Sequence, residues 1–309
     1  MKFCKKSRIF KQSQSQNRTL LKNQKKRFSV DPEIVKSVKG QTILIKVGGN
    51  ALTDVEIKKN IITQISTLQK FGTRVVLVHG GGIEIKRLLD EVSVKSEFIG
   101  GHRKTDAHSI SYIEMALSGM VNKELVALLH RAGLKAVGIS GKDGALVIAE
   151  KRKHTTNVDG IEQEIDLGFV GNVASINTDL VNTLLNSGYT PVISPISIGE
   201  DGETYNINAD MFAGHIAGAL KADRFIALTN IDGLLQDIDN PESIIHHLSA
   251  VEAKKLFGTV IQGGMIPKIE ACLIALEKGV KTSQIVNGTK QDELLRILLT
   301  KDKLGTTIG

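Results

Sequence analysis

The chain has 309 residues, of which 41% are hydrophobic and 24% charged, an ordinary composition for a globular protein. No apolar run reaches the roughly 18 residues that a membrane-spanning helix requires. The net charge of +7 is concentrated in residues 1–30, which contain ten Lys and Arg and no acidic residue. The remainder has 30 basic and 33 acidic residues, a balance that argues against a nucleic-acid-binding surface on the folded part.

Residues 1–28 are predicted to form a basic, disordered tail, because their hydrophobicity is low and their charge has one sign. They lack the continuous apolar core of a secretory signal. Their acid-poor composition also fits an organelle-targeting segment or an arm that binds a polyanion or a partner. The expected location is therefore the cytoplasm, or a plastid or other organelle stroma. Two cysteines, Cys4 and Cys272, are consistent with a reducing compartment and provide no disulfide framework.

Strand-like and helix-like segments alternate over the rest of the chain. Strands are predicted at 42–47 and 74–78 and within KAVGI, ALVIA, TPVIS, RFIALT and SQIVN. Helices are predicted at 83–92, 110–131 (with Gly133 as its C-cap), 177–187, 210–220, 250–257 and 268–278. This alternation predicts a mostly parallel sheet covered by helices on both faces. The polar stretch 150–168 is expected to form short antiparallel strands, and Pro195–Glu203 to separate two lobes.

Glycine-rich turns follow the first two predicted strands. Lys46 ends the first strand and precedes Gly48 and Gly49, and Gly80–Gly82 follow the second. Glycine lets a ligand approach the backbone closely, and a helix that begins just afterwards directs free N–H groups toward an anion. The turns are therefore candidate carboxylate or phosphate sites. A tight strand-to-helix connection without a ligand explains them equally well.

Two further motifs combine polar groups with predicted helix starts. In FIGGHRKTD, Arg103 could clamp a carboxylate with its bidentate fork, or could pair with Asp106. In YNINAD, helix capping explains at least one of Asn206, Asn208 and Asp210, but does not easily explain all three.

A third motif, GGMIPK, places Lys268 at a helix start, which repels cations unless an anion joins it. The sequence contains no P-loop, no dinucleotide-binding fingerprint, no metal-ligand cluster and no catalytic triad in its motif context. His79 and His130 are therefore expected to be structural. Two lysines, glycine turns, one Arg and one helix-start Asp suit phosphoryl transfer, which requires positioning and positive charge.

The motifs follow one another in a specific order across residues 42–309. They are IKVGGNAL, LVHGGG, GGHRKTD, MVNKELV, GISGKDGALVIA, DLGFVGNV, YNINADMFAG, GGMIPKIEACLIAL and LGTTIG. In this order the chain resembles the amino acid kinase family, and within it the kinases of acyl amino acids. The resemblance implies a single domain over 29–309, folded as a three-layer αβα sandwich with a mostly parallel central sheet. Residues from about 41 to 195 would form the acyl-amino-acid lobe, and those from about 196 to 309 the nucleotide lobe.

The same resemblance implies that MgATP phosphorylates the side-chain carboxylate of N-acetyl-L-glutamate to N-acetyl-L-glutamyl 5-phosphate, a step of arginine biosynthesis. Lys46 and Lys268 would stabilise the transferring phosphoryl group, and Asp210 would organise both lysines. The implied binding residues are Gly81, Gly82, Arg103 and Asn206 for the substrate and Gly48, Gly49 and Gly264 for the nucleotide. No protein residue is implied as a metal ligand.

Some residues depart from the family pattern and leave alternatives open. Gly100, His102 and Lys104 stand where the family usually has Asn, an apolar residue and Val, and Asn230 replaces a usual Asp. The substrate could instead be N-acetyl-aminoadipate or a related acyl amino acid of lysine biosynthesis, or carbamate. A catalytically silent amino-acid sensor is the alternative of a different class. It would need Arg103 but not both lysines.

The resemblance also implies a homo-oligomer. This would be a dimer or, if residues 29–40 form the N-terminal helix of arginine-inhibited members, a hexamer with arginine as effector.

Overall fold

The computed structural model describes residues 30–158 and 161–309. The predicted tail over 1–28 lies outside the described residues. Among those described, no helix is both long enough and apolar enough to cross a bilayer.

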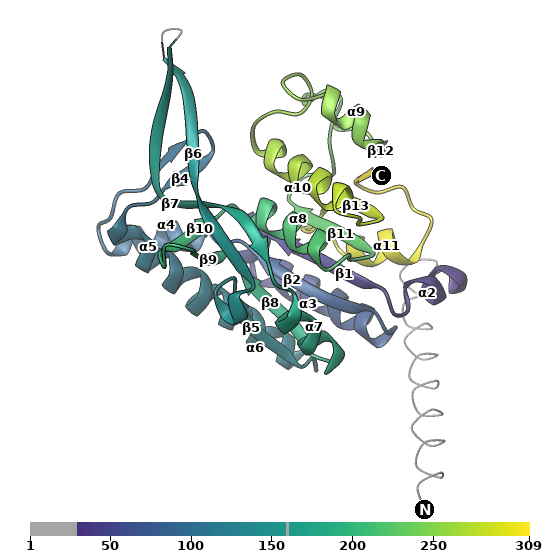
Figure 1. Cartoon of the computed structure of the whole chain (residues 1–309). Coiled ribbons are helices and arrows are strands. Elements are labelled where there is room, and N and C mark those ends of the chain that lie inside the picture. The colour runs from purple at the N-terminus through teal and green to yellow at the C-terminus, as the bar shows by residue number, and fades with distance from the viewer. Residues whose placement is uncertain (1–29, 159–160) are drawn as a thin grey trace, which may run out of the picture.

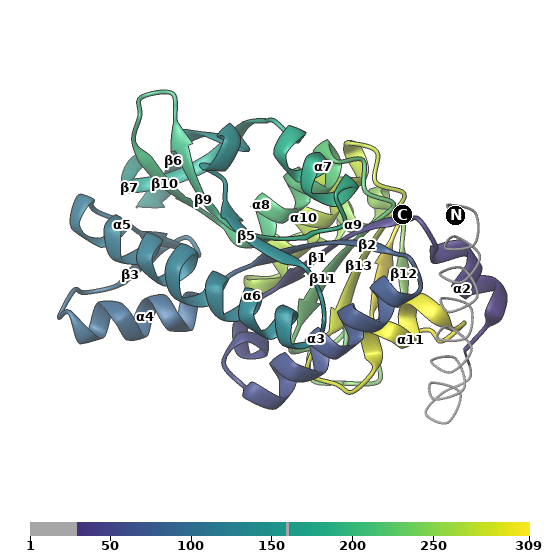
Figure 2. The ribbon, with the colours of Figure 1, turned by 90° about the horizontal axis from the view of Figure 1, so that it is seen from below.

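An eight-stranded sheet forms the centre of the molecule, with strand order β12-β14-β13-β11-β1-β2-β8-β5 (Figures 1 and 2). The strands are β1 (Thr42–Val47), β2 (Arg74–His79), β5 (Ala136–Ser140), β8 (Thr190–Ser194), β11 (Arg224–Thr229), β12 (His247–Leu248), β13 (Thr282–Asn287) and β14 (Thr306–Ile308). Within this sheet only the pairing of β13 with β14 is antiparallel. The predicted parallel sheet is therefore confirmed.

Helices cover both faces of this sheet, which confirms the three-layer αβα sandwich (Figure 2). One face carries α2 (Pro32–Val38), α3 (Val55–Lys70), α6 (Asn122–Arg131) and α11 (Glu293–Leu299). The other carries α7 (Asp179–Asn186), α8 (Ala209–Ala219), α9 (Ala250–Lys255) and α10 (Ile266–Glu277). Helices α3 and α11 are additions to the elements predicted above.

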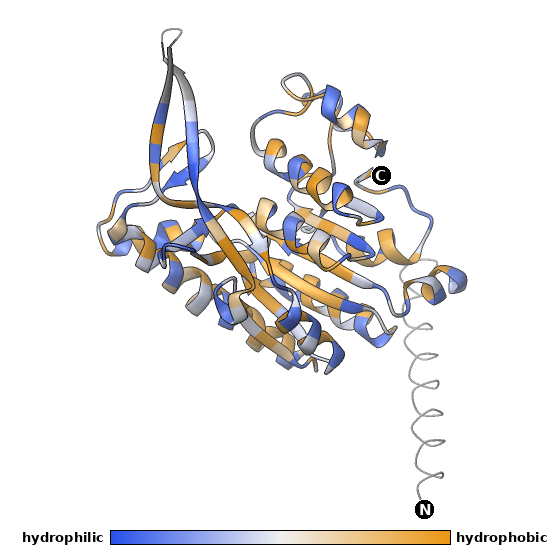
Figure 3. Ribbon diagram, in the orientation of Figure 1, coloured by the Kyte–Doolittle hydropathy of each residue, from blue (hydrophilic) through white to orange (hydrophobic). Residues whose placement is uncertain are grey.

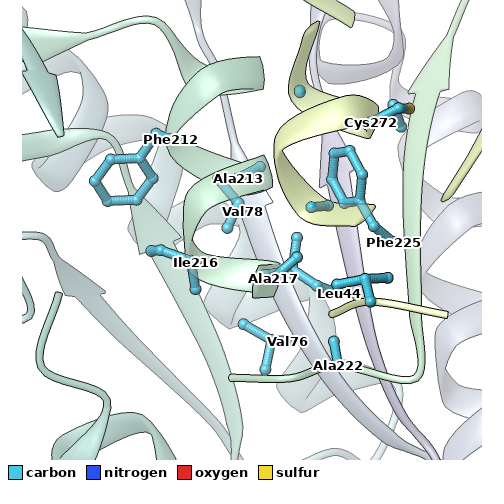
Figure 4. Packing of buried hydrophobic residues seen from close by; sticks show 14 of the residues in the cluster. Leu44, Val76, Val78, Phe212, Ala213, Ile216, Ala217, Ala222, Phe225 and Cys272 are labelled. Atoms are coloured by element: carbon cyan, nitrogen blue, oxygen red, sulfur yellow. The ribbon is translucent and has the colours of Figure 1, made fainter. Parts of the chain in front are cut away.

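The central strands alternate their side chains between the two helical layers, and both sets are buried. Leu44 and Val76 pack toward α8 and α10, whereas Ile43, Ile45 and Val75 pack toward α3 and α6. Figure 4 shows the first of these clusters. Because both faces are covered, β1, β2 and β11 are largely apolar (Figure 3), and Lys46, His79 and Thr229 are the polar residues at their carboxyl ends.

Helices α8 and α10 cross at very short range because α8 contains glycines at the contact. A Cβ atom on Gly214 would lie only 2.4 Å from the carbonyl oxygen of Ala271 in α10, so no larger residue fits without a shift of the helices. This crossing brings the first turns of the two helices, which carry Asp210 and Lys268, to the same place.

A second, smaller sheet is a closed barrel of β6 (Val147–Val158), β7 (Ile161–Ile176), β9 (Ile196–Gly199) and β10 (Thr204–Ile207). The predicted antiparallel pairing within 150–168 is confirmed, but the prediction of short strands was wrong, because β6 and β7 have 12 and 16 residues. They form a long hairpin that projects from the body, as Figure 1 shows. The predicted strand ALVIA begins β6 and thus belongs to this barrel.

The remaining elements complete the described chain. They are η1 (Gly49–Leu52), α4 (Gly82–Glu91), the hairpin of β3 (Glu97–Ile99) and β4 (His102–Lys104), α5 (Ala107–Glu114), η2 (Met115–Val121), η3 (Asp143–Ala145) and η4 (Gly263–Met265). The helix predicted over 110–131 is α5, η2 and α6 in succession, and η2 is a π-helical segment. Gly133 has a φ of +84°, as expected of a residue that ends a helix.

Candidate active site

Two lysines from different elements meet at one carboxylate. Lys46 Nζ, at the end of β1, lies 2.7 Å from Asp210 Oδ1, and Lys268 Nζ, in the first turn of α10, lies 3.1 Å from Asp210 Oδ2. The exposed fractions of the Lys46, Asp210 and Lys268 side chains are 7%, 8% and 19%. Three residues that are far apart in sequence thus form one cluster with a net charge of +1.

The charges of this cluster stabilise one another. Burial alone would raise the pKa of Asp210, but the charges of Lys46 and Lys268 outweigh it, and the pKa lies below its ordinary value. Burial lowers the pKa of Lys46, and the charge of Lys268 lowers it further, whereas Asp210 opposes the shift. A second anion near the two ammonium groups would compensate the remaining positive charge.

Asp210 is placed by the start of α8. Asn208 is the N-cap of this helix, and its side-chain oxygen accepts hydrogen bonds from the Asp210 and Met211 backbone N–H groups. The capping interpretation is thus confirmed for Asn208. Asn206 belongs to β10 and borders the cavity described next.

A cavity of about 220 Å³ opens beside this cluster. It is lined by Lys46, Asp210, Asn206, Asn208, Arg103, His102, Phe98 and the glycines 48, 49, 80, 81, 82 and 101, with apolar walls of Ile85, Leu117, Val170, Pro195, Ile207 and Ala209. Apart from Lys268 and Gly264, all the candidate site residues of the sequence analysis therefore border one cavity. Lys46 of β1 and the glycine turns that follow β1 and β2 line it, so the cavity lies at the carboxyl ends of these strands, as expected for an α/β sheet.

The glycines bring the backbone close to the cavity and to Lys46. A Cβ on Gly48 would lie 2.8 Å from Lys46 Nζ, so a side chain there would displace the ammonium group. Gly81 is the N-cap of α4 and provides no side-chain cap. The start of α4 therefore offers backbone N–H groups at the cavity, where the helix dipole favours negative charge.

Arg103 is buried, and contacts with three neighbouring residues fix the orientation of its side chain. Its guanidinium donates to Ser96 Oγ and, over 3.1 Å, to the carbonyl of Gly82, and it lies 4.6 Å from the centre of the Phe98 ring. The alternative pairing with Asp106 is not observed. Asp106 is instead the N-cap of α5 and accepts from the His108 and Ser109 N–H groups.

Residues beside the predicted motif residues also contribute to the site. Phe98 and Ser96 position Arg103, and the sequence signal for Phe98 was an aromatic residue five positions before an arginine. His102 borders the cavity, and burial together with the charges of Arg152 and His154 lowers its pKa to about 4. Lys104 is exposed and lies 3.4 Å from Glu97 on the neighbouring strand.

Two predicted residues lie outside the cavity lining. Lys268 contacts Asp210 Oδ2 from outside the lining, and Gly264 is exposed on η4, four residues earlier. Within residues 30–158 and 161–309, no group of three or more His, Cys, Asp or Glu side chains could hold a metal ion.

Comparison with known proteins places this geometry in a family. The model of the amino acid kinase family matches residues 41–287. The chain belongs to the amino acid kinase family. It is 43% identical to the acetylglutamate kinase of Moorella thermoacetica over 87% of the chain and 91% of the relative. It is 44% identical to that of Methanocaldococcus jannaschii over 87% and 90%.

Two solved structures have a similar fold. The N-acetylglutamate synthase of Neisseria gonorrhoeae, complexed with coenzyme A and N-acetyl-glutamate, superposes with a TM-score of 0.75 and 25% identity. The match covers 90% of this chain and 61% of the synthase. An isopentenyl phosphate kinase superposes with a TM-score of 0.59 at 20% identity over 86% of this chain and 100% of that chain, a likeness of fold alone.

Proposed function

We propose that this protein is a kinase of arginine biosynthesis that transfers the γ-phosphoryl group of ATP to the side-chain carboxylate of N-acetyl-L-glutamate. The products are N-acetyl-L-glutamyl 5-phosphate and ADP. The observation that carries the proposal is the sharing of Asp210 by Lys46 and Lys268 beside a cavity that Arg103 borders. The identity of over 40% to acetylglutamate kinases along nearly nine-tenths of the chain supports the choice of substrate.

In the transfer step, a carboxylate oxygen of the substrate attacks the γ-phosphorus, and the bond from this phosphorus to the β,γ-bridging oxygen breaks. The electron pair of that bond leaves with ADP. The acceptor is already ionised at neutral pH, so no general base is needed. Negative charge shifts among the phosphoryl oxygens during transfer, and we assign its stabilisation to Lys46 and Lys268. Asp210 would hold both ammonium groups in place without neutralising them completely.

Substrate binding is assigned to the cavity walls. Arg103 would hold the α-carboxylate, because its planar guanidinium is already directed by Ser96, Gly82 and Phe98. The N–H groups of Gly81 and Gly82 would bind the reacting carboxylate at the start of α4, and Asn206 would contact the polar end of the substrate.

The glycines assigned to the nucleotide leave room for its phosphate groups. Cβ positions on Gly49 and Gly264 have no heavy atom within 4 Å, so phosphate groups can approach the backbone at both. We assign Gly48, Gly49 and Gly264 to the nucleotide, residues 41–195 to the acyl-amino-acid lobe and residues 196–309 to the nucleotide lobe. Magnesium, held by the phosphates, would neutralise charge on the leaving group.

A panel of acceptors tests this assignment. ATP-dependent acyl phosphate is trapped as hydroxamate with N-acetyl-L-glutamate, N-acetyl-L-aminoadipate, L-aspartate and carbamate. The proposal expects the largest kcat/KM for N-acetyl-L-glutamate. A larger kcat/KM for the aminoadipate derivative would assign the enzyme to lysine synthesis. The absence of product with all four acceptors would favour the amino-acid sensor.

We further propose a homo-oligomer, either a dimer or a hexamer with arginine as effector. Helix α2 supports the second form because it lies where the arginine-inhibited members have an N-terminal helix. Deleting residues 1–40 removes α2, and because Val30 and Val38 are buried in the core, the stability of the shortened chain is measured alongside. Sedimentation and arginine titration of the full and the shortened chain are the test. If arginine does not inhibit the full chain, the result would favour the dimer.

A further inference from the structure

His79 ends β2 immediately before the glycine turn and is completely buried. Its Nδ1 lies 2.8 Å from the carbonyl oxygen of Gly80, and its Nε2 lies 3.1 Å from Asn122 Nδ2. A carbonyl oxygen only accepts and an amide nitrogen only donates, so the proton is on Nδ1 and Nε2 accepts. Burial also lowers the pKa of this imidazole to about 4, which keeps it neutral at pH 7.

Asn122 is held from several sides at once. Its Nδ2 lies 2.9 Å from Val192 O in β8 and 3.3 Å from Ile139 O in β5, and its Oδ1 accepts from Lys123 Nζ over 3.1 Å. The two carbonyl acceptors fix which end of the amide carries the nitrogen. The amide nitrogen of Asn122 therefore faces His79 Nε2, and its two hydrogens are shared among His79 Nε2 and the two carbonyl oxygens.

The surrounding structure makes room for this asparagine. A Cβ on Gly138 would lie 1.9 Å from Asn122 Oδ1, so β5 requires glycine at this position. Asn122 also follows directly after the π-helical segment η2. A π-helical turn contains an extra residue, which changes the direction in which the following side chains point. The motif MVNKELV of the sequence analysis therefore contributes a buried contact to the back of the glycine turn.

The hydrogen bond from His79 to Gly80 sets the orientation of the next peptide unit. In a trans peptide, the carbonyl of Gly80 and the N–H of Gly81 point in opposite directions. The Gly80 carbonyl points toward buried His79, so the Gly81 N–H points away from His79. Gly81 borders the cavity, and its N–H therefore faces the cavity side. Among the described residues, neither the Gly81 N–H nor the Gly82 N–H has a hydrogen-bond acceptor.

We propose that His79 and Asn122 are positioning residues, which hold the Gly80 carbonyl away from the cavity and so direct the Gly81 N–H at the reacting carboxylate of the acyl amino acid. This inference rests on the proposed function for the identity of the substrate. The positioning itself is a property of the free protein, and it can be measured without turnover.

The first measurement is the tautomer of His79 in the unliganded full chain. Long-range ¹⁵N–¹H spectra of histidine-labelled protein distinguish Nδ1–H from Nε2–H, and a His79→Gln sample assigns the signal. We expect a neutral ring protonated at Nδ1 at pH 7, opposite to the tautomer that free histidine prefers in water. An Nε2–H ring or an imidazolium would overturn the proposal.

The second measurement separates positioning from stability. Asn122→Ala should raise KM for the acyl amino acid by roughly tenfold, as expected when a hydrogen bond to a charged group is misdirected, with kcat and the KM for ATP little changed. Gln69→Leu is the control, because it removes the bond from Gln69 to Thr190 Oγ1 and does not involve the glycine turn.

The KM values of the two variants are measured at temperatures equally far below their respective melting temperatures. An Asn122→Ala enzyme whose KM matches that of Gln69→Leu would contradict the positioning role. If Asn122→Ala does not fold, Gly138→Ala, which displaces Asn122 Oδ1, replaces it in the same comparison. A wild-type protein with the Nδ1–H ring but no kinase activity would refute the proposed function and leave the geometry standing.

Discussion

The ammonium group of Lys46 lies 2.7 Å from Asp210 Oδ1, and Asp210 is shared with a second ammonium group, that of Lys268. One carboxylate therefore holds two cations at the edge of a cavity. An isolated buried charge is costly, but a net charge of +1 is suited to a site that receives a negatively charged phosphoryl group.

Replacing Lys268 by alanine should reduce turnover by at least about 100-fold, the usual size of the effect when one donor to the transition state is lost. Binding of N-acetyl-L-glutamate should change little, because Lys268 is not part of the cavity lining. Steady-state kinetics and calorimetry on the same preparation give the two quantities. A large loss of acyl-amino-acid affinity would instead assign Lys268 to substrate binding.

Gly48→Ala should lower kcat while leaving the fold intact, because the new methyl group would lie 2.8 Å from Lys46 Nζ and would displace it. The matched control is Gly119→Ala in η2, where a Cβ has no heavy atom within 4 Å. That variant should be as stable as the wild type and as active. Equal activity of the two variants would mean that the position of Lys46 is not critical.

Arg103→Lys should raise KM for N-acetyl-L-glutamate by about tenfold or more, since an ammonium group cannot reproduce a bidentate contact with a carboxylate. The KM for ATP should stay the same. Initial rates over both substrate concentrations provide the test. An unchanged KM for the acyl amino acid would exclude Arg103 as its carboxylate ligand.

His79 should make stability depend on pH. Its pKa is about 4 in the folded protein against 6.5 when unfolded, so the unfolded state binds more protons between these values. This contribution to the free energy of unfolding is complete above pH 6.5 and falls as pH decreases toward 4, by about 3 kcal/mol in total. Urea unfolding of the wild type and of His79→Gln at pH 7.5 and pH 4.5 measures it. An equal loss in both proteins would contradict the buried neutral ring.

The sequence was sufficient for the parallel sheet because each central strand is a short, continuously apolar run. Helix α3 escaped prediction because its pattern is mixed: Lys58 and Gln64 are buried within it, and Lys58 pairs with Glu124 of α6. Such pairings across the fold have no local signal. The β6–β7 hairpin was predicted as antiparallel, but its strands are longer than expected, because their polar residues resemble a loop.

For the candidate site, motif order brought together residues that no local rule connects. Chain spacing does not reveal that Asp210 lies between Lys46 and Lys268, since this depends on the α8–α10 crossing at Gly214. Helix-start chemistry predicted capping correctly for Asn208 but could not decide between Asp106 and a ligand as the partner of Arg103. The structure decides against Asp106, which caps α5.

The central claim is that a carboxylate oxygen of the acyl amino acid attacks the γ-phosphorus of ATP. N-acetyl-L-glutamate labelled with ¹⁸O in its side-chain carboxylate is incubated with enzyme, MgATP and hydroxylamine, and the inorganic phosphate released is analysed by mass spectrometry. Hydroxylamine attacks the acyl carbon, so the oxygen that bridges carbon and phosphorus leaves with the phosphate. The account predicts one ¹⁸O atom in each phosphate formed together with hydroxamate. Phosphate without label would contradict it.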